Sequence, residues 1–246
     1  MKLNRYKTKN MSKARRLLLV ALIMFFAAGA IGAIVVLINT EQEYNDAQNE
    51  YHELQKLSPF SFDSDPSPEA IAEATKNLMN INSDYIGWVK LDGTVIDYPV
   101  VRGVDNEQYI KMMFTGEEKK SGTIFMDWKC KNEFNSTLGI LYGHNLKDGN
   151  MFASLQKYRE KDYLYDHPII KIITKDGVKL SYRIFAVKVT DITDNLFSLW
   201  DKDINEVKGY FSPYDKSENI EHFLVLSTCV TGGGDNDRLL IFAGLE

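Results

Sequence analysis

The feature that most limits what this chain can fold into is an apolar run of 22 residues, Leu17 to Ile38, that contains no charged side chain. A helix of this length rises about 33 Å, which matches a membrane hydrocarbon core of roughly 30 Å. A cleaved signal peptide is the alternative, but its apolar stretch usually has only about 7 to 15 residues. We therefore expect residues 17–38 to form a transmembrane anchor.

Charge predicts the side of the membrane on which each part lies. Residues 1–16 carry seven of the 29 basic residues and no acidic one, which predicts a cytoplasmic basic segment by the positive-inside rule. Everything after Thr40 should then be the extracellular part of a single-pass protein of the cell membrane. That part holds the other 22 basic residues and all 34 acidic ones, and this acidic balance argues against a nucleic acid partner.

A stalk and a linker separate the anchor from the predicted folded domain. Residues 41–57 are polar with scattered Tyr and Leu, which is typical of a solvated helix that continues out of the membrane. Ser58–Pro68 contains three prolines and four serines, too many helix breakers for a regular element. We assign 39–66 to an extracytoplasmic stalk and linker. The folded domain is 67–246, and it opens with a helix that Ser67 can cap.

The folded domain is predicted to be mainly β with peripheral helices. Two Asp-Gly pairs, at 92–93 and 176–177, stand between neighbouring β-rich runs and are the strongest short-range signal for a hairpin. Eight such runs favour a closed or nearly closed barrel. The expected strands are 85–91, 94–101, 123–127, 137–143, 169–174, 178–190, 222–229 and 238–244. Short helices are expected at 106–113, 150–160 and 201–211.

Two cysteines, Cys130 and Cys229, lie in the exported part. In an oxidising compartment they could form a disulfide, which would suit a stapled surface domain that only binds. The alternative is that at least one of them is a working thiol. Cys229 ends an apolar run that starts at His222, so we expect its thiol at the mouth of a buried strand. Cys130 lies in a polar stretch and is interpreted as a bystander.

Arg238 opens the strand that follows Cys229, after a loop rich in Gly and Asp. If the two strands pair as a hairpin, Cys229 and Arg238 face each other across its open end. A thiolate beside a fixed guanidinium is a stabilised nucleophile, and the same cation can bind the oxyanion that forms when a carbonyl is attacked. The pattern predicts a cysteine nucleophile with an arginine partner.

A thiol nucleophile also needs an acid to protonate a leaving amine, and the chain offers four histidines. His52 lies in the predicted stalk, and His167 precedes a proline in a predicted turn. His222 should be roughly 23 Å from the thiol along one strand and on the opposite face. His144 follows a glycine at the end of a predicted strand, and it is the favoured acid and base.

Several segments of the folded domain form a specific combination: Asp84-Tyr-Ile-Gly-Trp-Val-Lys, Thr94-Val-Ile-Asp-Tyr-Pro-Val-Val, Gly122-Thr-Ile-Phe-Met-Asp, Leu141-Tyr-Gly-His-Asn, Leu226-Ser-Thr-Cys and Arg238. Together they resemble the sortases, class B in particular, over residues 67–246. The resemblance implies an eight-stranded sortase barrel with His144, Cys229 and Arg238 as its catalytic triad.

The same resemblance implies a reaction and its partners. Cys229 would attack the Thr carbonyl in the sorting signal of a secreted protein, with Asn-Pro-x-Thr-x or a similar motif, to form an acyl-enzyme. An amine of the peptidoglycan precursor would then release the product. Ser227 and Thr228 would bind substrate by lining the groove, and the insert around 191–221 would shape it. The resemblance implies no cofactor and no metal.

Two other functions fit the same residues. A hydrolytic cysteine protease with the same triad would differ only in using water, rather than an amine, to resolve the acyl-enzyme. A surface binding domain stapled by a disulfide between Cys130 and Cys229 would need no nucleophile. The aromatic residues Trp88, Tyr98 and Phe125 are interpreted as core in either case.

Overall fold

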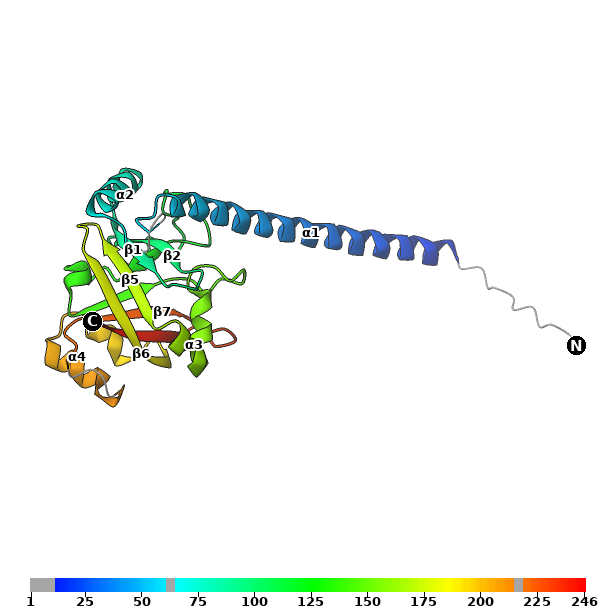
Figure 1. Ribbon diagram of the computed structural model, residues 1–246. Coiled ribbons are helices and arrows are strands. Elements are labelled where there is room, and N and C mark those ends of the chain that lie inside the picture. Colours follow the sequence, from blue (N-terminus) through cyan, green and yellow to red (C-terminus); the bar gives the residue numbers. More distant parts are fainter. Residues whose placement is uncertain (1–11, 61–64, 215–218) are drawn as a thin grey trace, which may run out of the picture. The chain divides into compact units, whose positions relative to one another are not determined.

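The computed structural model describes residues 12–60, 65–214 and 219–246 (Figure 1). The chain divides into two compact units, of which one ends at Asn45 and the other comprises Asp46–Glu246. The first helix, α1 (Lys13–Gln55), contributes residues to both. All strands of the described ranges belong to the second unit.

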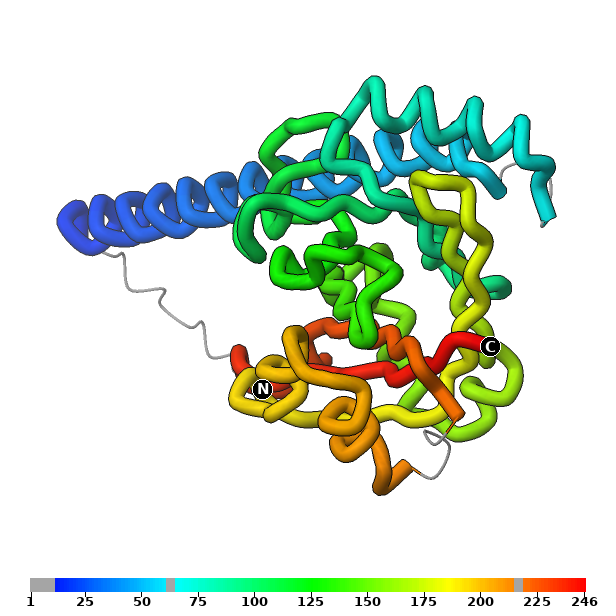
Figure 2. Tube along the Cα trace, turned by 90° about the vertical axis from the view of Figure 1, so that its left-hand side faces the viewer, coloured from blue at the N-terminus to red at the C-terminus, as the bar shows by residue number. Residues whose placement is uncertain are grey.

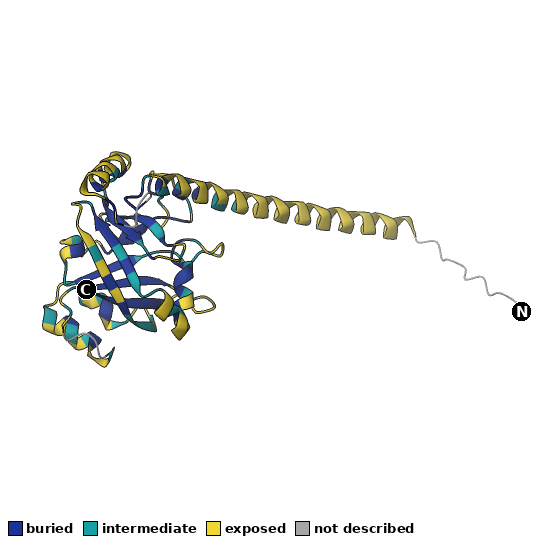
Figure 3. Cartoon of the chain, in the orientation of Figure 1, coloured by how far each residue is buried: buried dark blue, intermediate teal, exposed yellow. Residues whose placement is uncertain are grey.

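In the first unit, the apolar part of α1 exposes its side chains, as the yellow colour of the helix in Figure 3 shows. Leu17 and Phe25, for example, are 71% and 73% exposed. Within the described ranges, α1 is the one helix that is long and apolar enough to cross a membrane. It is therefore a candidate membrane anchor. The predicted basic segment 1–16 lies mostly outside the described residues.

In the second unit, eight strands form a closed barrel in the order β1-β2-β3-β4-β7-β8-β6-β5. This confirms the predicted fold class, and closure leaves no strand edge unpaired. The strands are β1 (Tyr85–Lys90), β2 (Asp97–Val101), β3 (Ile124–Met126), β4 (Leu138–Tyr142), β5 (Ile169–Thr174), β6 (Lys179–Asp191), β7 (Phe223–Cys229) and β8 (Asp237–Leu245).

The two Asp-Gly pairs lie in the connections between antiparallel neighbours, β1 with β2 and β5 with β6. Gly93 has a φ of +74° and Gly177 a φ of +82°. Glycine enters this left-handed region without the Cβ clash that other residues meet. The predicted hairpins are therefore confirmed.

Side chains of β7 alternate between two apolar clusters. Leu224 and Leu226 belong to the main core, whereas Phe223 and Val225 belong to a second cluster. The second cluster packs against η3 (Asn195–Ser198) and α4 (Ile204–Phe211), which lie in the insert between β6 and β7. Figure 2 shows this insert, in yellow and orange, coiled beside the red strands. The second cluster therefore marks the outer face of the barrel.

The remaining helices are short. In α2 (Pro68–Ile81) the Ser67 side chain accepts a hydrogen bond from the Ala70 amide at 3.2 Å, which confirms the predicted cap. The helix expected at 150–160 corresponds to η2 (Ala153–Arg159), and the one at 201–211 corresponds to α4. The others are η1 (Glu133–Asn135), α3 (Lys161–Asp166) and η4 (Ser212–Tyr214).

The helix expected at 106–113 was wrong, because these residues take no helical conformation in the structure. The Asp105 carboxylate accepts the next backbone amides, as Asx turns do, and so competes with a first helical turn. The carbonyls of Tyr109 and Lys111 accept from amides at 119–123 instead of amides four residues on. The segment is thus a loop that is bonded to the chain following it.

The last turns of α1 pack into the second unit. Ala47, Tyr51 and Leu54 are all at least 95% buried, and their spacing of four and three residues places them on one helix face. The sequence favoured a solvated helix over 41–57, because three apolar positions give too weak a pattern to reveal their partners. The compact unit that contains the barrel therefore begins before the predicted linker.

Candidate active site

The predicted nucleophile and its arginine partner face each other across a strand pair. β7 and β8 are antiparallel, and the last pair of their register joins Cys229 with Arg238. Residues directly opposed in an antiparallel pair have Cα atoms about 4.5 to 5.5 Å apart and point to the same face. Cys229 shares the parity of Val225, and Arg238 that of Leu240, so both side chains lie on the outer face.

His144 reaches the same surface through the parallel pairing of β4 with β7. Tyr142 aligns with Ser227, and the next backbone amide donates to the Ser227 carbonyl at 3.2 Å, so the ladder continues past the end of β4. His144 and Cys229 each lie two residues beyond this last pair, at the ends of neighbouring strands that are about 4.8 Å apart. The structure therefore brings the three predicted site residues together at one rim of the barrel.

Gly143 allows the close packing under the histidine. A Cβ atom on Gly143 would lie 2.5 Å from the Ile124 side chain and 2.6 Å from the Phe152 ring. The Gly143 carbonyl also accepts a hydrogen bond from Thr228 Oγ1 at 2.7 Å. These contacts fix the backbone that carries His144 against the strand that carries the thiol.

The imidazole of His144 is held by a backbone carbonyl, with 2.7 Å between Nε2 and Ile110 O. Because a carbonyl oxygen only accepts, Nε2 must carry a proton in this contact. Nδ1 is then the ring nitrogen left to exchange a proton with a reacting group.

Two amide side chains that were not identified from the sequence hold the backbone of the predicted nucleophile. Asn145 Nδ2 donates to the Cys229 carbonyl at 3.0 Å and to Thr231 Oγ1 at 2.8 Å. Gln156 Nε2 donates to the same Cys229 carbonyl at 2.9 Å. The position of Asn145 beside His144 could have suggested its role, whereas nothing in the sequence near Gln156 points to the site.

Arg238 is oriented by its own loop. Its Nη1 donates to the Asp235 carbonyl at 2.8 Å and to the Asp237 carbonyl at 3.0 Å. In the described part of the chain its Nε and Nη2 atoms have no protein partner, so three N–H donors remain for a ligand. The two backbone carbonyls therefore fix the orientation of the guanidinium, and its remaining donors can bind a ligand.

The start of the insert is anchored beside Arg238. Thr190 of β6 pairs with Arg238, and its Oγ1 donates to the Asp194 carboxylate at 2.8 Å. Burial alone would raise the pKa of Asp194, but hydrogen bonds from Lys188 and the Leu196 amide help lower it to about 2. Asp194 stays ionised at neutral pH and binds the insert to the strand next to the site.

Ser227 and Thr228, which were expected to line a substrate groove, are 1% and 3% exposed. Ser227 lies under the outer surface, and Thr228 uses its hydroxyl for the contact with the Gly143 carbonyl. Their substrate-binding role stays a prediction, and their burial does not favour it.

The two cysteines are both free. Cys130 is buried, and its thiol lies 3.4 Å from the Leu138 carbonyl at the start of β4. Leu138 aligns with Phe223, six residues before Cys229, so the two thiols are roughly 20 Å apart. A disulfide requires Cα atoms within about 7 Å. The structure thus excludes the disulfide on which the stapled binding domain depended.

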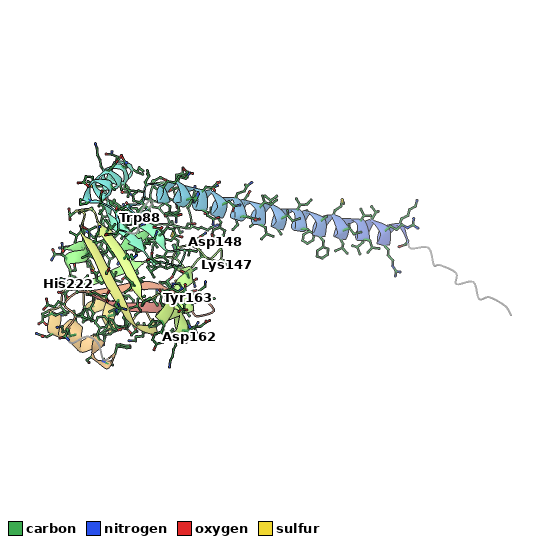
Figure 4. All side chains as sticks on the ribbon, in the orientation of Figure 1. Trp88, Lys147, Asp148, Asp162, Tyr163 and His222 are labelled. Atoms are coloured by element: carbon green, nitrogen blue, oxygen red, sulfur yellow. The ribbon has the colours of Figure 1, made fainter. Side chains whose placement is uncertain are left out.

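The other histidines lie away from the site. The His222 ring contacts the Ser136 carbonyl at 3.1 Å, at the opposite end of β7 from Cys229. In Figure 4, His222 lies on the left and Asp148, in the loop after His144, on the right. The His167 ring bonds to the Asp92 carbonyl at 2.8 Å. No cluster of three or more metal-binding side chains occurs among the described residues.

A closed barrel with an exposed cysteine, a histidine and an arginine at one rim has the groups that acyl transfer through a thiol requires. The sequence profile of the sortase domain matches residues 89–246. The chain therefore belongs to the sortase family, whose members are cysteine transpeptidases, and this family membership confirms the predicted enzyme type.

The relatives are class B sortases. Sortase B of Staphylococcus aureus is 32% identical over 182 residues, which cover 73% of this chain and 70% of that protein. Sortase B of Listeria monocytogenes is 41% identical over 98 residues, but the match spans only 40% of each protein. The structure of a cysteine-to-serine mutant form of Clostridium perfringens sortase B is 29% identical, with a TM-score of 0.69 over 81% of this chain and 98% of that one.

Proposed function

We propose that Cys229, His144 and Arg238 join a secreted protein to an amine of the cell wall or its precursor. The observation that carries this proposal is the common outward face of the three side chains at adjacent strand ends. The start of the insert lies beside the same surface, because Thr190 pairs with Arg238 and donates to Asp194. The protein substrate is a sorting signal of the Asn-Pro-x-Thr-x type.

In the first step, the Cys229 thiolate attacks the Thr carbonyl of the sorting signal, and a C–S bond forms. The negative charge moves to the carbonyl oxygen, where the Arg238 guanidinium donates to it. The C–N bond then breaks, and the leaving amine takes a proton from Nδ1 of His144. The products are a thioester on Cys229 and a free peptide that begins with the new amine.

In the second step, the proton moves in the opposite direction. The acceptor amine gives a proton to the now neutral Nδ1 of His144 and attacks the thioester carbonyl. A new amide bond forms, and Cys229 leaves as the thiolate. The acceptor is an amine of the peptidoglycan precursor. In this arrangement α1 anchors the enzyme with its N-terminus in the cytoplasm and the barrel outside, where both substrates are found.

The full-length chain in detergent micelles should cleave a fluorescent Asn-Pro-x-Thr-x peptide after Thr. Adding triglycine as the amine should replace the hydrolysed product with a new amide, because the thioester partitions towards the better nucleophile. Mass spectrometry of the products measures both. A matched peptide with Thr replaced by Asp should remain intact.

Product ratios also test the alternative function. If triglycine in large excess leaves the product entirely hydrolysed, the enzyme is a protease with the same triad, and the proposed transfer is wrong. If no peptide of an Asn-Pro-x-Thr-x panel is cleaved while the thiol still reacts with a small alkylating agent, the proposed sorting motif is wrong.

Arg238→Lys should lower kcat/KM by about 10² to 10³, equivalent to roughly 3 to 4 kcal/mol of transition-state stabilisation. Lysine keeps the charge but offers a point charge on a flexible stem, whereas the guanidinium is held by two backbone carbonyls and presents a planar set of donors. Peptide kinetics on the folded variant measures the loss. Arg183→Lys on β6, where the side chain pairs with Glu246, is the matched control and should change little. Near wild-type kcat/KM for Arg238→Lys would remove Arg238 as the oxyanion donor.

A further inference from the structure

The Ile110 carbonyl that holds His144 lies against Gly122. A Cβ atom on Gly122 would be 2.4 Å from Ile110 O and 2.6 Å from Tyr109 O, and Gly122 has a φ of +55°. The neighbouring Thr123 amide donates to Tyr109 O at 3.1 Å. The position of the carbonyl that orients the imidazole is therefore set by the backbone at Gly122.

Gly122 is bonded in turn to α1. The Tyr51 hydroxyl donates to the Gly122 carbonyl and lies 3.3 Å from Thr123 Oγ1, which itself donates to the Met112 carbonyl at 2.8 Å. Burial raises the pKa of Tyr51, so its hydroxyl stays protonated and remains a donor. One buried side chain of α1 thus contacts the end of the loop that carries Ile110 directly, and it reaches Met112 in the same loop through Thr123.

A second set of contacts leads from Tyr51 to the other side of His144. The Tyr51 ring packs edge-on against the Tyr98 ring, with 5.3 Å between centroids. The Tyr98 hydroxyl accepts the Met151 amide at 3.2 Å, and the following amide, that of Phe152, donates to the His144 carbonyl at 2.9 Å. Contacts that start at Tyr51 therefore lead both to the ring of His144 and to its backbone.

The preceding residue of α1 binds the same loop. The Glu50 carboxylate accepts the Thr115 hydroxyl at 2.9 Å and the Thr115 amide at 3.3 Å, and it lies 4.0 Å from Lys119 Nζ. Residues 115 and 119 lie between Ile110 and Gly122. Helix α1 therefore contacts this loop at its tip and at its return.

We propose that Tyr51 is a positioning residue for the proposed catalytic histidine, and that it acts through Gly122 and the Ile110 carbonyl. The end of α1 that follows the candidate membrane span thus has two roles: it tethers the enzyme, and it supports the active site. This proposal rests on the proposed function only in the role that it gives to His144. The contacts from Tyr51 to Ile110 do not depend on that function.

Tyr51→Phe in the full-length chain in micelles tests the proposal, because it removes the hydroxyl and keeps the ring that packs on Tyr98. We expect kcat for peptide cleavage to fall about tenfold with KM within twofold, since a displaced acid slows proton transfer without changing binding. The Nε2 proton of His144, observed by NMR with ¹⁵N-labelled histidine and assigned by its loss in His144→Ala, should exchange faster with water.

Leu54→Ala is the matched control, because Leu54 is buried on the same helix face and has no hydrogen bond to the loop. It removes more packing and should lower Tm more than Tyr51→Phe, yet leave the Nε2 proton exchange unchanged. The proposal fails if Tyr51→Phe keeps wild-type exchange, or if both variants change exchange equally. The NMR comparison needs no substrate, so it gives an answer even if no sorting peptide is cleaved and the proposed function is wrong.

Discussion

Replacing Cys229 with alanine should abolish peptide cleavage and the covalent intermediate, with a loss of at least about 10⁴ in kcat, because no other described group at the rim can form the thioester. Intact-protein mass spectrometry after mixing with a sorting peptide measures the acyl-enzyme directly. The wild-type mass should increase by the acyl fragment, and the Cys229→Ala mass should not change.

Cys130→Ala is the internal control for this experiment. Burial raises the pKa of the Cys130 thiol to about 11, so it is protonated at neutral pH and is not a nucleophile. We expect wild-type acylation and a loss of stability of about 1 kcal/mol from the emptied space. Comparable loss of acylation in both variants would mean that the two thiols depend on each other, contrary to their separate positions.

His144→Ala should lower kcat by about 10³, because a positioned acid and base typically contributes about 10² to 10⁴ and each step of the proposed reaction needs a proton transfer at Nδ1. The thiol itself remains in place, so alkylation of Cys229 by a small reagent should still occur. Stopped assays with the fluorescent peptide measure the loss of turnover, and circular dichroism verifies the fold.

His222→Ala is the matched control, since His222 contacts a carbonyl at the far end of β7. It should affect stability rather than chemistry. Turnover of His144→Ala within tenfold of wild type would show that another group supplies the proton, and the assignment of His144 would then be wrong.

The fold could be predicted because its signals are local. The Asp-Gly turns, the prolines before α2 and the apolar runs each depend on a few adjacent residues, so the eight strands follow from the sequence to within a few residues at each end. The loop at 106–113 was wrongly expected to be helical, because its carbonyls bond to residues 119–123. No local pattern reports such a distant partner.

The candidate site, like the fold, could be predicted where its signals are local. Cys229 and Arg238 belong to neighbouring strands of one hairpin, and His144 could be chosen by excluding the other histidines. Asn145 and Gln156 were missed, because amide side chains occur throughout a chain and only their distances to the Cys229 carbonyl identify them. The buried contacts of Tyr51 likewise could not be predicted, because its partners Gly122 and Thr123 lie 71 and 72 positions further along the chain.

The parallel pairing of β4 with β7 has a consequence for how the enzyme becomes active. His144 and Cys229 are 85 positions apart in the chain, and their strands meet only when the β4–β7 pair closes the ring. Contacts between such distant segments form late, since the entropy of closing a long loop opposes them until the rest of the sheet is in place. Until folding is complete, Cys229 therefore lacks His144 beside it. The specific activity of a preparation then measures the fraction of molecules that have reached the native topology.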